Sequence, residues 1–125
     1  MSYNWDLMAR LLREIRDNGE ETFKPRQIAE AHAMAMEGSG QSLPDMDDFR
    51  MEAANYEGDL FNGGFIVARP DDLGGNGENF ALTERGTRLL QLLENGGSQA
   101  RQRLDSLDSA ALTGESFDPL AADFR

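Results

Sequence analysis

The sequence predicts one mainly helical α+β domain, and three observations support this prediction. Hydrophobic residues recur every three or four positions over long segments, which is typical of helices with one buried face. Two short β-leaning segments, residues 65–68 and 79–82, flank a glycine-rich loop and predict a two-stranded hairpin. The length of 125 residues suits a single domain with one core.

Two helices are predicted in the first third of the chain. Asn4 is a good N-cap for a first helix, and Asn18-Gly19 is expected to end that helix with a left-handed residue. Pro25 suits the first turn of a second helix, which the glycines at 38 and 40 end. The inner side of the second helix is expected to consist of Ile28, Ala29, Ala31, Ala35 and Met36.

A third helix is predicted to start near Pro44-Asp45 and to end at residues 62–64. The hairpin follows it, and Thr83 caps a fourth helix that ends at residues 95–97. Residues 98–107 suit a short fifth helix. Residues 1–107 therefore form the domain. Residues 108–125 are expected to be an acidic, mobile tail, or to dock only through Phe117, Leu120 and Phe124.

The order helix, helix, helix, hairpin, helix is that of a winged helix, in which the hairpin is the wing. Loop chemistry and periodicity agree along the chain, which favours this architecture. Each element contributes an apolar stripe, and together these stripes predict a core centred on Trp5, Leu11, Ile15, Ile28, Phe49, Leu60, Ile66 and Leu89.

Three segments also resemble known proteins. Leu82-Thr83-Glu84-Arg85-Gly86 resembles the segment that joins the wing to the last helix in many bacterial winged-helix regulators. With the apolar pattern of residues 4–15 and the glycine before the first strand, the chain is similar to an uncharacterised family of short winged-helix-like proteins of bacterial genomes and prophages. The resemblance covers about residues 4–95. It implies a fold and a mobile-element setting, and it brings no catalytic residues.

The charge balance is strongly acidic, with 23 Asp and Glu against 12 Lys and Arg and a formal net charge of −11. Proteins that neutralise DNA phosphates usually show the opposite balance. A bland alternative is that the acidity serves solubility. Without cysteine, a signal-peptide pattern or a long apolar run, the chain is expected to be cytoplasmic, in a bacterial host cell.

Patterns that would support catalysis or metal binding are weak. His32 is the only histidine, so a histidine-based dyad or a multi-histidine metal site is excluded. The glycines at 74–77 lack the lysine and the following helix of a phosphate-binding loop. Residues 72–83 superficially resemble a calcium loop, but Gly74 and Thr83 stand where oxygen ligands belong. We therefore expect no enzyme activity, no metal and no cofactor.

The third helix carries the most informative pattern, because this is the element that reads DNA in a winged helix. This helix carries several carboxylates but only one basic residue, Arg50. The carboxylates would repel phosphates. The predicted partner-binding residues are Asp45, Asp47, Asp48, Glu52, Glu57 and Asp59, with Asp71, Asp72 and Glu78 of the wing. A solvated acidic surface without a partner remains the alternative.

We therefore expect a non-enzymatic acidic module that binds a basic surface of a bacterial protein or ribonucleoprotein complex, with carboxylates imitating nucleic acid. By analogy, its concrete form is a phage-encoded, anti-CRISPR-like inhibitor of a bacterial defence or nucleic-acid-processing complex. The competing hypothesis is a winged-helix DNA-binding transcriptional regulator, dimeric, using a basic patch of Arg10, Arg13 and Arg16 on the first helix. A structural oligomer built through the C-terminal helices is a third.

Overall fold

The computed structural model describes residues 3–107 and 112–124, and over these residues the chain is mainly helical with one antiparallel two-stranded sheet. The predicted α+β class is confirmed. In chain order the elements are α1 (Trp5–Asn18), α2 (Pro25–Gly38), α3 (Met46–Asn62), β1 (Ile66–Ala68), the 3-10 turn η1 (Asp71–Leu73), β2 (Phe80–Leu82), α4 (Glu84–Asn95), α5 (Gly97–Asp105) and α6 (Gly114–Ala122).

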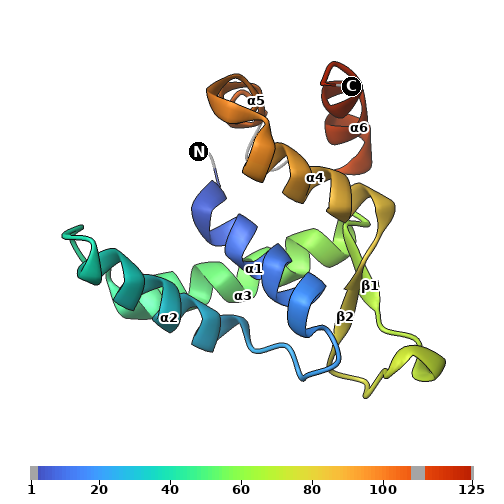
Figure 1. Ribbon diagram of the computed structural model, residues 1–125, viewed down its shortest axis with the longest axis horizontal. Helices are drawn as coiled ribbons and strands as arrows, with labels where there is room; N and C mark the ends of the chain where they lie inside the picture. The colour runs from blue at the N-terminus through green and yellow to red at the C-terminus, as the bar shows by residue number, and fades with distance from the viewer. Residues whose placement is uncertain (1–2, 108–111, 125) are drawn as a thin grey trace.

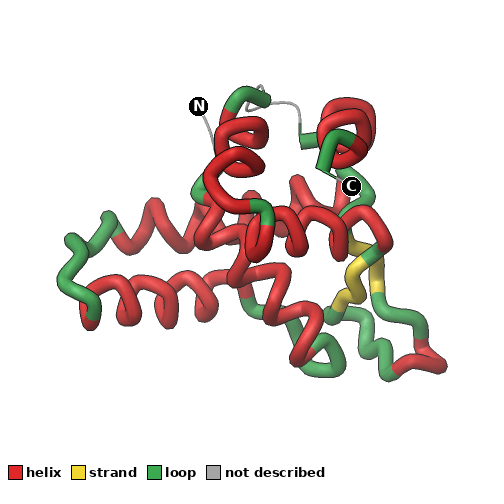
Figure 2. Tube along the Cα trace, turned by 45° about the horizontal axis from the view of Figure 1, so that its top comes forward, coloured by secondary structure: helices red, strands yellow, loops and turns green. Residues whose placement is uncertain are grey.

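The molecule has a body and a projection. Figure 1 shows α1 at the centre, with α4, α5 and α6 gathered on one side of it. Helices α2 and α3 run side by side and project away from the rest as a helical hairpin (Figure 2). In a helix-turn-helix the turn is about three to four residues long, whereas residues 39–45 separate these two helices.

Helix caps are present at three starts, and two of them, Asn4 and Thr83, were predicted. The side chain of Asn4 accepts a hydrogen bond from the backbone N–H of Leu7 at 3.1 Å, and Thr83 accepts one from Gly86 at 3.1 Å. Asp45 caps α3 in the same way. The left-handed stop predicted at Gly19 is wrong, because its φ is −66°. Glycine is needed there for space, since a Cβ would collide with the carbonyl oxygen of Ile15 and the guanidinium of Arg69.

Helix α1 supplies the largest part of the core. Seven of the eight predicted core residues are buried, and Ile28 is only partly buried. The inner side of α2 was predicted correctly only in part. Ala29 is buried and Ile28 and Met36 pack against the core, but Ala31 and Ala35 are exposed and the buried Ala33 was not predicted. An alanine-rich helix has many equivalent apolar faces, so its pattern does not say which face packs against α3.

The predicted hairpin is confirmed, with Ile66 opposite Leu82 and Ala68 opposite Phe80. Only Ile66 of the three β1 residues is buried, which fixes the side of the sheet that faces the core. The strands are short, and the loop between them contains η1 rather than continuing the ladder.

The structure adds a helix, α6, where the sequence analysis placed none. Thr113 and Ser116 form a capping box at its start. Phe117 is buried with its ring 5.2 Å from that of Phe65 in an edge-on contact, and Leu120 is buried beside it. The docking expected of Phe117 and Leu120 is therefore seen, whereas Phe124 is only partly buried. Residues 108–111 of the predicted tail lie outside the described residues.

Candidate functional site

The carboxylates predicted on helix three do not form one line. With about 3.6 residues per turn, Asp48, Glu52 and Asp59 share one flank of α3, and Glu57 lies on the opposite flank. The buried stripe that includes Phe49 separates the two flanks. Glu57 is partly buried, and burial raises the pKa of its carboxyl group.

Two of the predicted carboxylates hold the N-terminal segment against α3. The hydroxyl of Tyr56 donates to Glu52 at 2.7 Å and accepts from the backbone N–H of Asn4 at 2.6 Å. The hydroxyl of Tyr3 donates to Asp59 at 3.0 Å. Burial, and then these hydrogen bonds to carboxylates, raise the pKa of both tyrosines. Glu52 and Asp59 therefore have a structural role that the sequence analysis missed.

The first turn of α3 carries the exposed carboxylates. Asp45 accepts from the backbone N–H groups of Asp47 and Asp48 at 3.0 and 3.2 Å, as an N-cap does. The side chain of Asp47 is 96% exposed and lies 3.3 Å from Arg50, which also pairs with Glu30 of α2 at 2.8 Å. Negative charge is favourable at this end of a helix, so the position has a local explanation as well as a potential use in binding.

The wing carboxylates lie far from the first turn of α3. Asp71, Asp72 and Glu78 are exposed, and Figure 1 places η1 at the end of the molecule opposite the start of α3. The predicted surface is therefore divided into two acidic regions. Sequence reasoning treated the third helix and the wing as neighbours because they are consecutive in the chain.

The wing loop is tied to the connection between α1 and α2 by a residue that the sequence analysis did not single out. Asn79 is 2% exposed, and its amide donates to the carbonyl oxygens of Glu20 and Gly74, both at 3.0 Å. Its side-chain oxygen accepts from the backbone N–H of Asn76 at 3.0 Å. An asparagine inside a predicted strand gave no signal beyond its low β propensity.

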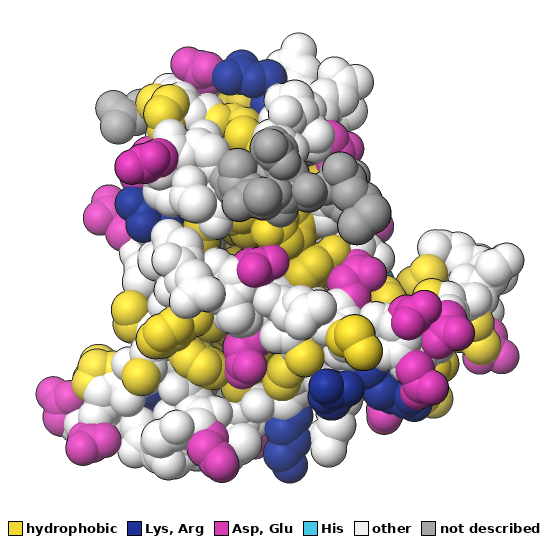
Figure 3. Space-filling view, turned by 180° about the vertical axis from the view of Figure 1, so that it is seen from behind, with side chains coloured by type: hydrophobic (Ala, Val, Ile, Leu, Met, Phe, Trp, Pro, Cys, Tyr) yellow, Lys and Arg dark blue, Asp and Glu magenta, His cyan; other side chains and the backbone are white. Residues whose placement is uncertain are grey.

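Exposed large hydrophobic side chains accompany the carboxylates. Among the described residues they all lie between positions 34 and 73, and none lies on α1, α4, α5 or α6. They are Met34 (72% exposed), Leu43 (50%), Met51 (54%), Phe61 (49%), Val67 (44%) and Leu73 (58%). Figure 3 shows the molecule from behind, where carboxylates lie singly or in small groups between hydrophobic and uncharged side chains.

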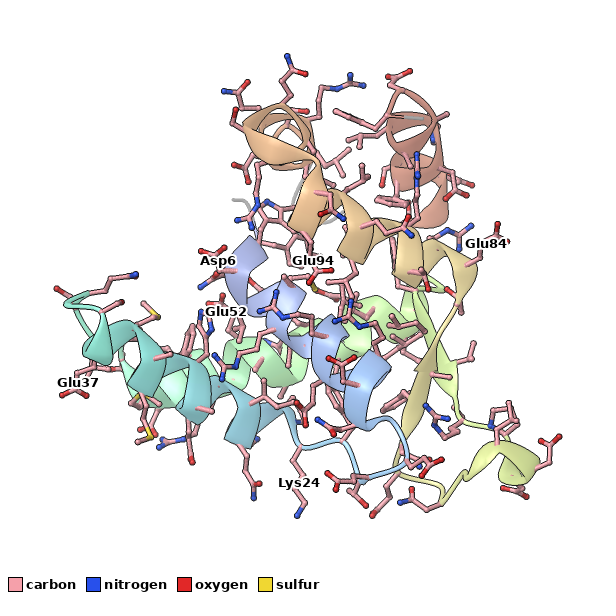
Figure 4. All side chains as sticks on the ribbon, in the orientation of Figure 1. Asp6, Lys24, Glu37, Glu52, Glu84 and Glu94 are labelled. Atoms are coloured by element: carbon pink, nitrogen blue, oxygen red, sulfur yellow. The ribbon has the colours of Figure 1, made fainter. Side chains whose placement is uncertain are left out.

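The alternative basic patch on α1 is mostly neutralised. Arg13 and Arg16 lie 3.7 and 3.2 Å from Glu94 of α4, and Arg16 also pairs with Asp17 at 2.8 Å. Figure 4 shows Glu94 between α4 and α1. Arg10 forms no such pair among residues 3–107 and 112–124. Two of the three arginines therefore lie beside carboxylates, and only Arg10 lacks one in the described part of the chain.

Within the described ranges, no three His, Cys, Asp or Glu side chains are placed to hold a metal ion together. None of the helices in those ranges has the length and apolar character needed to cross a membrane. Comparisons of the chain with protein-family models, curated proteins and solved structures give no match.

Proposed function

We propose that the chain is a non-enzymatic protein-binding module of winged-helix-like architecture. It engages a partly basic partner through the exposed side of the α2–α3 hairpin. The observation that carries the proposal is that exposed large hydrophobic side chains and exposed carboxylates occur together on this hairpin. Met51 and Phe61 are about half exposed on α3, the helix whose first turn bears Asp47 and Asp48.

This mixture favours a protein partner over nucleic acid. Protein interfaces combine an apolar centre with a polar rim, and methionine and aromatic residues are enriched in them. A surface that only imitated nucleic acid would need carboxylates spaced like phosphates, without exposed apolar groups among them. The carboxylates instead suit the rim of a protein interface. There they speed association with a basic partner surface and disfavour binding to acidic partner surfaces.

Support for the winged-helix-like architecture comes from the element order and from the hairpin that follows α3. The resemblance to short winged-helix-like prophage proteins makes an inhibitor of a bacterial defence or nucleic-acid-processing complex the concrete form of the proposal. A DNA-binding regulator is less favoured, because Arg13 and Arg16 are already paired with carboxylates.

The test replaces the two exposed carboxylates of the first turn of α3 and compares them with a matched pair. In the test variant Asp47→Lys and Asp48→Lys are combined. In the control Glu84→Lys and Glu115→Lys are combined, since these are exposed residues in the first turns of α4 and α6. Both variants change the net charge equally and lose similar helix-dipole interactions. A third variant, Met51→Ser, removes apolar surface without changing charge.

Partners captured from a bacterial lysate are quantified for all four proteins. The proposal expects one set of partners to be lost with the α3 variant and with Met51→Ser, and kept with the control. Equal capture of partners by all variants would contradict a role of the α2–α3 hairpin in partner binding. Binding of the unmodified protein to duplex DNA at physiological salt, measured by fluorescence anisotropy, would favour the regulator instead.

A further inference from the structure

Arg10 is an unpaired cation in an acidic protein. Six of the described basic side chains form ion pairs with carboxylates, and Arg69 and Arg88 donate to backbone carbonyl oxygens. Over residues 3–107 and 112–124, only Arg10, Lys24 and Arg26 do neither. With a formal net charge of −11, carboxylates are plentiful, so an arginine without one needs an explanation.

Arg10 lies between two clefts along the contact of α1 with α2. It lines a larger cleft of about 590 Å³ and a smaller one of about 250 Å³. The larger cleft falls within the range of about 300–1,000 Å³ that is typical of small-molecule sites. Its apolar lining is formed by the side chains of Ile15, Phe23, Ile28 and Phe80.

A second group without a partner lies in the smaller cleft. The Nδ1 atom of His32 is buried and has no hydrogen-bond partner among the described residues. Burial first, and then the nearby charge of Arg10, lower the pKa of this imidazole. Asp6, which also lines the smaller cleft, does not neutralise Arg10, because it pairs with Arg101 at 2.8 Å.

We propose that the contact between α1 and α2 is a binding site for an amphipathic monoanion. The carboxylate of the ligand pairs with Arg10, and its aliphatic or aromatic body covers the apolar lining of the larger cleft. An arginine can hold a carboxylate through two parallel hydrogen bonds, which are stronger than neutral ones. Lys24 points away from the fold into solvent (Figure 4), so Arg10 is the anchoring group.

The charges at the cleft restrict the ligand to one negative charge. Glu14 and Glu21 also line the larger cleft and would repel a second carboxylate in the ligand body. None of the residues that line the two clefts belongs to the predicted acidic set. The site therefore shares no residue with the acidic set, although α2 contributes to both the clefts and the α2–α3 hairpin.

The experiment uses decanoate as the probe, titrated into the full chain by calorimetry. Decanol has the same chain without the charge, and decanedioate has a second carboxylate. We expect decanoate to bind with a Kd below about 1 mM and the other two at least about tenfold more weakly. Arg10→Met is expected to weaken decanoate binding by at least about tenfold, whereas Arg26→Met changes it less than about twofold.

Arg26 is the matched control because it is also unpaired but lines neither cleft. Equal weakening by the two variants, equal binding of decanol, or no decanoate binding at about 1 mM would overturn the proposal. If Arg10→Met does not fold, the pKa of His32 in the unmodified protein is measured by NMR with each ligand, and this measurement tests the site. Decanoate neutralises the Arg10 charge and is expected to raise the pKa of His32, and decanol is expected to leave it unchanged. An unchanged pKa with decanoate also contradicts the site.

Discussion

Helices α1 and α2 have the same length, fourteen residues each, but use their surfaces very differently. Helix α1 has seven buried residues, and α2 has two, Ala29 and Ala33. α1 is surrounded by the other elements, whereas α2 packs mainly along α3 in the projecting hairpin (Figure 1). The difference separates a region that stabilises the fold from one that is available for contacts.

Exposed hydrophobic side chains follow the same division. The body formed by α1, α4, α5 and α6 shows none of the large ones, whereas the helical hairpin and the wing carry all six. Single exposed apolar residues are ordinary on protein surfaces, but their restriction to the α2–α3 hairpin and the wing is informative. The body therefore buries its large hydrophobic side chains more completely than the α2–α3 hairpin and the wing do.

The comparison is tested most strongly by truncating two side chains of the body and one of the α2–α3 hairpin. Leu89→Ala and Ile15→Ala remove fully buried groups of the body and are expected to cost about 2–5 kcal/mol of unfolding free energy. Met51→Ala on the hairpin is expected to change it by less than about 0.5 kcal/mol. Urea unfolding measures all three. A similar loss for Met51→Ala would mean that the hairpin is as tightly packed as the body.

Asn79→Ala tests how the wing is held. The substitution leaves the carbonyl oxygens of Glu20 and Gly74 without their donor, and it is expected to cost about 1–3 kcal/mol. Asn55→Ala, at an exposed position of α3, is the control and should be close to neutral. Hydrogen exchange is expected to rise at residues 19–23 and 70–79 in the first variant alone. Unchanged exchange there would show that the strands hold the wing without Asn79.

His32 predicts a pH dependence for the contact between the two regions. Its pKa is lowered in the folded protein, so the unfolded chain takes up the proton more readily. The free energy of unfolding is not reduced by His32 above a pH of about 6.5, the pKa of a histidine in the unfolded chain. It declines as pH falls below that value, because the unfolded chain then takes up the proton. Urea unfolding between about pH 7.5 and pH 5.5 is expected to show a smaller decline for His32→Gln than for the unmodified protein. Parallel curves would contradict this.

The smallest effect is expected at the ion pair that joins α6 to α4. Arg85 donates to both carboxylate oxygens of Asp118, at 2.9 and 2.8 Å, and holds the pKa of that carboxyl below its usual range. The pair is partly exposed, so Asp118→Asn is expected to cost less than about 1 kcal/mol. Faster hydrogen exchange should be confined to α6. A large global loss of stability would mean that the pair stabilises the whole fold and not α6 alone.

Local chemistry explains what the sequence by itself determined. The start of α1 follows from the cap at Asn4, and the start of α4 follows from Thr83, because a side-chain oxygen satisfies backbone N–H groups only a few residues away. The β-hairpin formed by β1 and β2 follows from two β-leaning segments around a glycine-rich loop. The buried stripes of α1 and α3 follow from helical spacing.

Only the tertiary structure decided which polar groups meet. Glu52 and Asp59 looked like free surface charges in the sequence, but they accept hydrogen bonds from tyrosines, and one of these, Tyr3, is 56 positions from its partner. Asn79 became buried because the wing folds back onto the connection between α1 and α2. The wing carboxylates and those of the first turn of α3 came to lie at opposite ends of the molecule. Such contacts depend on how the helices and strands pack. Packing brings together residues at arbitrary distances along the chain, so no repeating sequence pattern predicts these contacts.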